Sequence, residues 1–125
     1  MSFMSSFSNN VSERDEIANL IGTEDVCGLP VFGAKGRRLG FIEEVMFDKF
    51  TGKATYAVVS ADHGSSSGRH PVPWSHMRYT DEPAGYELEI EAETLARAPV
   101  LSGTDWSDPE MRRKILDFYR RPIAV

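Results

Sequence analysis

The chain has 125 residues, of which 41% are hydrophobic and 26% are charged, and its formal net charge is −5. This composition is typical of one soluble globular domain, and no apolar run approaches the roughly 20 residues that cross a bilayer, so membrane insertion is excluded. The negative charge argues against a protein built to neutralise nucleic-acid phosphates, which need a basic excess.

The first residues predict a flexible leader over 1–15, because serines and asparagines dominate and no hydrophobic period is sustained. This segment has neither the basic start nor the continuous apolar run of a signal peptide. Cys27 is the only cysteine, so no disulfide can form within the chain. Both features predict a cytoplasmic location.

Residues 16–103 are expected to form the folded domain, in which short apolar runs alternate with turn signals. The first run, 26–32, contains Pro30, which cannot donate to a ladder and so predicts an edge strand or an interrupted one. We interpret Cys27 in this run as a small buried hydrophobe. The run at 39–48 places Leu39, Phe41, Val45 and Phe47 on one face, and Gly40 predicts a bulge or a sharp bend.

The middle of the chain carries the strongest strand signals. Residues 48–53 predict a hairpin connection with Gly52 in a left-handed conformation. Residues 54–60 are apolar on both faces, which predicts a strand buried on both sides or covered by another segment. A solvated loop over 62–68 leads to Pro71 and Pro73, which favour extended backbone, and Trp74 is expected in the core.

A brief strand over 78–80 is followed by strict alternation over 86–91, with Tyr86, Leu88 and Ile90 facing inward. Five or six short strands without a long intervening helix predict a mainly β fold. The expected architecture is a small six-stranded antiparallel β-barrel with a C-terminal α-helix.

Residues 104–125 are expected to form a helical extension, with the helix over 107–121. Ser107 and Glu110 match a capping box, and Pro122 ends the helix. One apolar stripe runs along the helix and must dock on its own domain or on another chain. We predict a homodimer, with a candidate interface made of Trp106, Met111, Ile115, Phe118 and Tyr119.

Several segments of the chain resemble the PRC-barrel domain family in their order and spacing, over roughly residues 20–100. They are Ile-Gly-Thr-Glu-Asp-Val at 21–26, the glycine-flanked strand around 36–45, Thr-Gly-Lys at 51–53 before the 56–60 strand, and Pro-Val-Pro-Trp-Ser at 71–75. The structural residues of this pattern are Gly40, Gly52, Pro71, Pro73 and Trp74.

The family includes the cytoplasmic domain of the photosynthetic reaction-centre H subunit and the C-terminal domain of a ribosome maturation factor. The resemblance implies a six-stranded barrel that acts as an adaptor docking on larger assemblies. This chain looks like a stand-alone version, because it has neither the transmembrane helix of the first protein nor the preceding domain of the second. Neither specific function is therefore carried over.

No catalytic, metal or cofactor site is predicted. Asp62, His63, His70 and His76 match no metal-binding spacing and are interpreted as solvated loop residues. Serines 65–67 and Cys27 lack an oriented base. The glycine-rich segment 33–40 precedes a strand and not a helix, so it cannot form a phosphate cradle.

Two functions of different classes remain. The first is a non-enzymatic adaptor that binds itself and an unidentified protein partner. The alternative is an RNA- or ribosome-associated maturation module, indicated by the family and by the basic run of Arg112, Arg113 and Lys114. The net charge of −5 favours the first and makes nucleic-acid binding unlikely.

Overall fold

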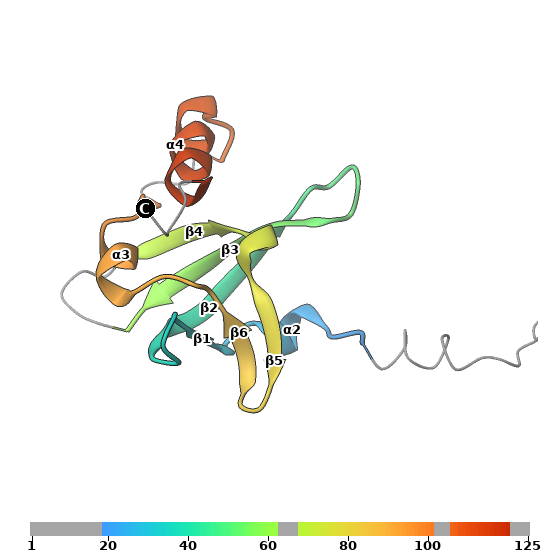
Figure 1. The fold of residues 1–125 in the computed structure, drawn as a ribbon. Helices are drawn as coiled ribbons and strands as arrows, with labels where there is room; N and C mark the ends of the chain where they lie inside the picture. Colours follow the sequence, from blue (N-terminus) through green and yellow to red (C-terminus); the bar gives the residue numbers. More distant parts are fainter. Residues whose placement is uncertain (1–18, 63–67, 102–105, 121–125) are drawn as a thin grey trace, which may run out of the picture.

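The computed structural model describes residues 19–62, 68–101 and 106–120, and the expected leader over 1–15 lies outside these ranges (Figure 1). The helices and strands follow one another as α2 (Thr23–Val26), β1 (Pro30–Phe32), β2 (Arg38–Phe47), β3 (Ala54–Ala61), β4 (Arg69–Pro73), the 3₁₀ turn η1 (Trp74–His76), β5 (Arg78–Asp81), β6 (Ala84–Glu87), α3 (Ala92–Ala96) and α4 (Pro109–Arg120). The mainly β fold with a C-terminal helix is therefore confirmed.

Within the described residues, six strands form one sheet in the order β4-β3-β2-β1-β6-β5. The expectation of a purely antiparallel sheet is wrong, because β1 and β6 run parallel, with Val31 opposite Tyr86. The cause is η1, which connects β4 at one edge to β5 at the other without a hairpin between them. β6 then returns beside β1 in the same direction. β4 and β5 remain separate edges, so the described sheet curls but does not close.

The face pattern of β2 differs from the predicted one because two irregularities interrupt its pairing with β3. The register shifts between Ile42 and Glu44, and again between Met46 and Phe47. Ile42 is fully buried, whereas Phe47, predicted to share a face with Leu39 and Val45, is 50% exposed. A third shift, in the pairing with β1, falls beside Gly40, where a bulge or bend was expected.

The first predicted run is also different in the structure. Residues 23–26 form α2, and Cys27 lies in the turn that follows, where its side chain is exposed and not buried as predicted. Pro30 is the first residue of β1, a position where a missing N–H is tolerated. β1 is an inner strand of the sheet, so the edge alternative is wrong, whereas the interruption of the 26–32 run at Pro30 is confirmed.

The strand over 54–60 has the predicted double-sided burial, with Ala57, Val58 and Val59 fully buried in β3. The alternating segment that was expected to be a strand over 86–91 pairs only as far as Glu87. Leu88 and Ile90 nevertheless stay buried, as predicted. The connector between Ile90 and α4 contains the short helix α3, which the sequence of its five residues did not predict.

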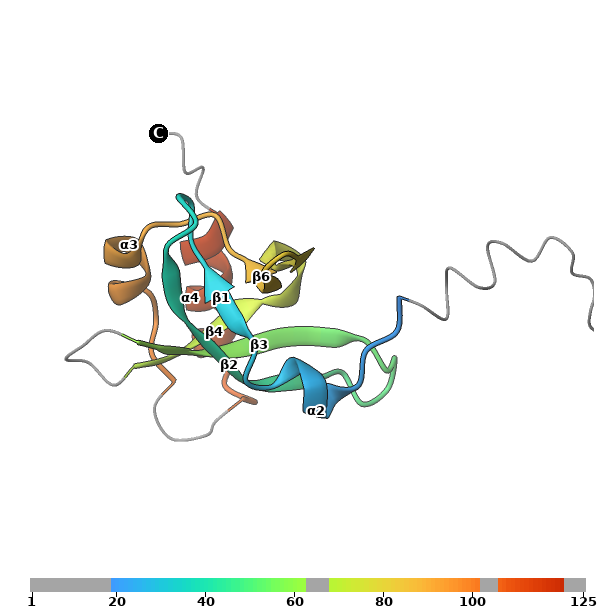
Figure 2. The ribbon, with the colours of Figure 1, turned by 90° about the horizontal axis from the view of Figure 1, so that it is seen from below.

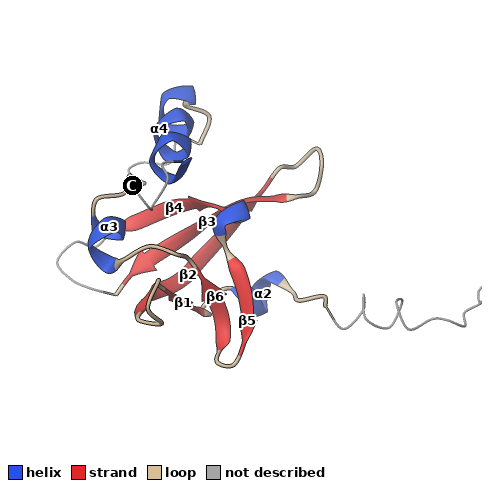
Figure 3. Cartoon of the chain, in the orientation of Figure 1, coloured by secondary structure: helices blue, strands red, loops and turns tan. Residues whose placement is uncertain are grey.

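α4 begins two residues later than predicted and packs against β4 of its own chain (Figure 3). The carboxylate of Asp108 accepts the N–H of Glu110 at 3.0 Å, so Asp108, one residue after the expected Ser107, caps the helix. Ile115 is fully buried and Tyr119 is 7% exposed. The apolar stripe of α4 therefore joins the core of the same chain.

Seen from below, α2 and α3 lie at opposite ends of the sheet (Figure 2).

Candidate functional site

A groove of about 570 Å³ lies where the end of β6, the turn η1, the helix α3 and the last turns of α4 meet. It is the candidate functional site. The apolar part of its lining, here called the floor, includes Leu88, Ile90 and Phe118. Its charged lining, here called the rim, consists of Arg78, Glu87, Glu89, Glu91 and Arg97.

The floor forms because the chain turns as soon as it leaves the β6 ladder. The N–H of Ile90 donates to the carbonyl of Leu88 at 2.7 Å, and the N–H of Ala34 donates to the carbonyl of Ile90 at 3.0 Å. These bonds hold both side chains inward, so Leu88 is 1% and Ile90 6% exposed. Phe118 stands edge-on to Tyr119, with ring centroids 5.0 Å apart, and completes the apolar lining.

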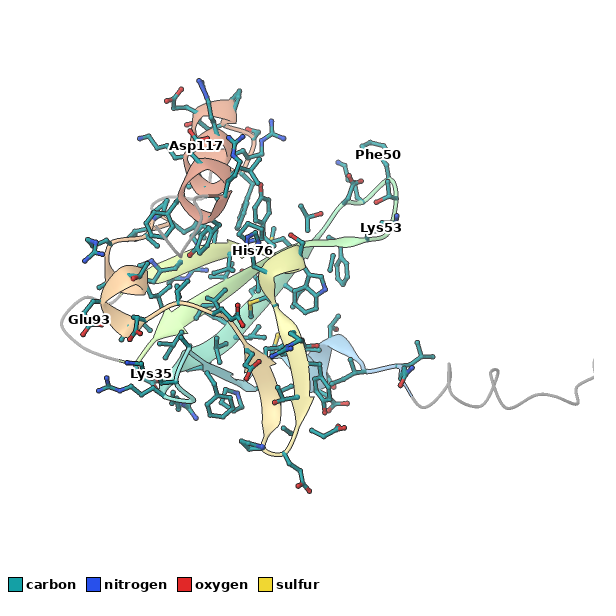
Figure 4. The ribbon with its side chains drawn as sticks, viewed as in Figure 1. Lys35, Phe50, Lys53, His76, Glu93 and Asp117 are labelled. Atoms are coloured by element: carbon teal, nitrogen blue, oxygen red, sulfur yellow. The ribbon has the colours of Figure 1, made fainter. Side chains whose placement is uncertain are left out.

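His76 fixes the wall of the groove that α4 supplies. Its Nε2–H donates to the carbonyl of Tyr119 at 3.1 Å, in the last turn of the helix, where carbonyls have no partner within the helix. The hydroxyl of Ser75 donates to Nδ1 at 3.5 Å, which is consistent with this tautomer. The imidazole also lies 5.8 Å from the ring of Tyr119. His76 therefore ties η1 to α4, beneath which Figure 4 places it.

The rim combines paired and unpaired charges. Arg78 forms an ion pair with Glu87, which raises the pKa of the guanidinium. Lys35 approaches Glu91 at 3.9 Å. Glu89 is exposed and makes no ion pair with any described residue. An apolar floor between charged walls is suited to the non-covalent binding of a side chain or an extended segment.

His70 lies outside the groove, and its predicted place in a solvated loop is wrong. The residue belongs to β4 and is only 1% exposed. Nδ1–H donates to the carbonyl of Pro99 at 3.2 Å, while Nε2 has no partner among the described residues. Gly68 packs so closely that an added Cβ would lie 2.6 Å from Nε2. Burial lowers the pKa of His70, so the residue is a neutral structural group.

The other residues weighed as metal ligands do not gather around His70. Asp62 pairs with Arg38 at 2.7 Å, His76 is bound to α4, and His63 lies outside the described residues. Over the described ranges, no three His, Cys, Asp or Glu side chains are grouped as they would be to hold a metal ion.

The five residues predicted for an interface lie at different depths. Ile115 and Tyr119 are buried against their own sheet, while Trp106, Met111 and Phe118 are half-buried and pack on the core. Trp106 lies 5.4 Å from Tyr56 of β3. Only Phe118 and Tyr119 line the groove. The sequence identified Leu88 and Ile90 as inward residues but not as a groove floor, because the position of α4 over them is a tertiary feature.

The structural motif residues occupy the places that shape the sheet. Gly40 lies against the backbone of Ser60, and Gly52 has a φ of 78°, as its predicted left-handed conformation requires. Pro71 and Pro73 are buried in β4, an edge strand in which a missing N–H leaves no gap in the ladder. Trp74 is half-buried beside Tyr86, at 5.2 Å between ring centroids, and therefore belongs only partly to the core.

Among the helices that the structure describes, none has both the length and the apolar character needed to cross a membrane. Comparison with curated proteins finds no match. Comparison with family models finds the PRC-barrel domain, which matches residues 18–86, more than half of the chain. This match covers α2, the strands from β1 to β5 and all but the last residue of β6, and it agrees with the resemblance seen in the sequence. The chain therefore belongs to the PRC-barrel domain family.

Proposed function

We propose that this chain is a non-enzymatic adaptor that holds a segment of a partner protein in the groove between the end of β6 and α4. The observation that carries the proposal is the groove itself, a hollow of about 570 Å³ in which the half-buried ring of Phe118 lies among charged residues, with Leu88 and Ile90 buried behind the lining. An apolar floor supplies affinity by burial, and fixed charges on the rim select the partner and its orientation.

The adjacent sheet edge supports the same function. β5 is an edge strand of the described sheet, and its first residue, Arg78, lines the groove. An edge strand offers unpaired backbone groups to which an extended segment can add. A partner segment that leaves the groove along β5 would therefore gain backbone hydrogen bonds in addition to side-chain contacts.

The charges of α4 favour a protein partner over RNA. Arg113 pairs with Glu110 at 2.7 Å, and Arg120 pairs with Asp117 at 2.5 Å. Two of the helix's basic groups thus already have carboxylate neighbours, which reduces the positive charge that the helix can offer to phosphates. Self-association stays part of the proposal, but the buried Ile115 and Tyr119 do not offer a surface for it without rearrangement of the helix.

The test is capture of partners from native lysate by the full chain, with quantitative mass spectrometry. A groove variant, Glu89→Lys with Thr94→Arg, reverses one rim charge and places a long side chain where Thr94 lines the cavity. A control variant, Glu24→Lys, makes the same charge reversal on α2, away from the groove. The proposal expects at least one protein to be retained by the wild type and the control, and to fall about tenfold or more with the groove variant. Equal retention by all three chains contradicts it.

A further inference from the structure

The two edges of the described sheet differ in how open they are. β4 contains Pro71 and Pro73, which lack an N–H, and α4 packs against this strand. β5 contains no proline and lies as the outer strand beside β6, against which it chiefly packs (Figure 3). Among the described residues, no backbone hydrogen bond outside the β5–β6 ladder involves β5. Because alternate residues of an edge strand direct their backbone groups outward, β5 offers a row of unpaired donors and acceptors.

A row of aromatic rings ends at this open edge. The ring centroids of Trp74 and Tyr86 lie 5.2 Å apart, and those of Tyr86 and Tyr79 lie 5.4 Å apart. Tyr86 is 5% exposed, whereas Tyr79, which faces it across the β5–β6 ladder, is 46% exposed. The last ring of the row is therefore covered on one side and open on the other. An aromatic side chain on an added strand would cover the open side.

The charges of β5 make the strand complementary to an antiparallel copy of itself. β5 begins with Arg78 and ends with Asp81, and Glu82 follows in the turn. Neither acid forms an ion pair with a described residue. Arg78 pairs with Glu87 through one terminal nitrogen, and a guanidinium has further N–H donors for a second carboxylate. Antiparallel copies place the basic start of each strand beside the acidic end of the other, whereas parallel copies would align like charges.

Tyr79 is the residue about which two copies of β5 pair best. An antiparallel pair of identical strands related by a two-fold axis has one residue that faces its own copy. With Tyr79 in this position, two exposed rings meet and Arg78 faces Thr80 of the second copy. With Arg78 or Asp81 in this position, like charges would face each other. With Thr80 there, both rings would lie opposite carboxylates.

We propose that two copies of this chain pair antiparallel through β5, with Tyr79 facing Tyr79 of the second copy, and form a two-fold dimer with one continuous sheet. The inference goes beyond the proposed function of the groove, because it assigns the β5 edge to a second copy and leaves the partner segment to the groove alone. Since both chains use the same surface, assembly stops at two chains, and the dimer carries two grooves. A contact made by one short strand is small, so association is expected in the micromolar range.

The first experiment is sedimentation velocity of the full chain across the micromolar range. The wild type is expected to show a mass that rises with concentration toward that of a dimer. Tyr79→Lys places two ammonium groups opposite each other and removes the ring pair, so the dissociation constant is expected to rise about 30-fold or more. Tyr79→Phe keeps the ring and should associate like the wild type. Phe50→Lys is the matched control, because it replaces another exposed aromatic residue, which Figure 4 places at the end of the β2–β3 hairpin.

Disulfide trapping tests the register of the pairing. Cys27 is first replaced by serine, so that a new cysteine is the only thiol. Residues that face each other in an antiparallel pair have Cα atoms about 5 Å apart, which suits a disulfide. Tyr79→Cys is therefore expected to form a covalent dimer under mild oxidation at least about tenfold faster than Asp81→Cys. The second cysteine lies on the same strand but too far from its own copy to be bridged.

Circular dichroism melts establish that each variant is folded. The proposal is overturned if the wild type is monomeric throughout this range, if Tyr79→Lys associates normally, or if Asp81→Cys is trapped as fast as Tyr79→Cys. A monomeric wild type whose capture of a protein from lysate is lost in Tyr79→Lys assigns the edge to a strand of another protein and also overturns it. A monomeric wild type whose partner capture depends only on the groove leaves the adaptor function standing and refutes only this inference.

Discussion

His70 connects the protonation of one buried side chain to the stability of the sheet. Its imidazole lies in β4, donates to the carbonyl of Pro99, and leaves Nε2 without a described partner. Burial lowers the pKa of His70 below its ordinary value of 6.5. As the pH falls through 6.5, the unfolded chain therefore takes up a proton that the folded chain does not bind. Stability is unaffected by this group above that pH and decreases below it.

We predict that urea unfolding of the wild type gives a lower free energy of unfolding at pH 5.5 than at pH 7.5. His70→Asn keeps a donor for Pro99 but removes the ionisable group, so its free energy should change less over the same interval. His63 and His76 are present in both chains, so the difference between the two chains reports on residue 70. Equal pH dependence of the two chains would contradict a buried neutral His70.

Tyr119 has a buried hydroxyl that accepts no hydrogen bond and donates none within the described residues. Burial raises the pKa of this phenol, so it is neutral under all ordinary conditions. Because a buried polar group without a partner costs free energy, Tyr119→Phe is predicted to be neutral or to stabilise the protein by up to about 1 kcal/mol.

The matched variant is Tyr119→Ala, which removes the ring from the core and should cost about 3–5 kcal/mol. Both values come from chemical denaturation at neutral pH. A loss of stability by Tyr119→Phe would indicate that the hydroxyl has a partner and is not merely buried.

At the scale of the element, β2 is shaped by a glycine that no other residue can replace. Gly40 pairs with Ala61 of β3, and an added Cβ would collide with the carbonyl oxygen of Ser60. Gly52 is different, since its surroundings are open but its φ of 78° disfavours a side chain. Gly40 is therefore required by close packing, whereas Gly52 is required by its backbone conformation.

The same substitution at both positions should give unequal costs. Gly40→Ala is predicted to destabilise by about 3 kcal/mol or more, because the strand pair must separate locally. Gly52→Ala should cost about 1 kcal/mol, the penalty of a left-handed alanine. Thermal and urea unfolding measure both. Similar losses for the two variants would place Gly40 farther from β3 than the structure does.

At the scale of the whole molecule, α4 belongs to the core although it follows the segment that matches the family. Ile115 is fully buried against the sheet, whereas its neighbour Leu116 is 49% exposed. Ile115→Ala is predicted to cost about 2–5 kcal/mol, the range for a buried aliphatic side chain. Leu116→Ala should change the free energy of unfolding by about 0.5 kcal/mol or less. Equal effects in urea unfolding would mean that α4 does not rest on its own sheet in solution.

The charge of the whole molecule predicts weak contact with nucleic acid. A chain of net charge −5 whose helical arginines are partly paired neutralises few phosphates. Fluorescence anisotropy with structured RNA at about 150 mM salt should therefore detect no submicromolar binding. Tight binding that weakens steeply with added salt would favour the maturation-module alternative over the adaptor.

Local patterns in the sequence were sufficient for the features that depend on neighbouring residues. The Gly52 turn, the doubly buried β3 and the apolar stripe of α4 are confirmed, since turn chemistry and periodicity act over a few residues. The combination of glycine and proline motifs was also sufficient to identify the family.

Features that depend on distant segments were decided only by the tertiary structure. The parallel pairing of β1 with β6 brings together residues more than 50 positions apart, and no local pattern encodes it. The bulges of β2 change the face of Ile42 because β3 sets the register. The sequence predicts His70 in a solvated loop. In the structure the residue is buried, because the segment before α4 folds over it. The groove exists for the same reason, since its floor comes from one part of the chain and its wall from another.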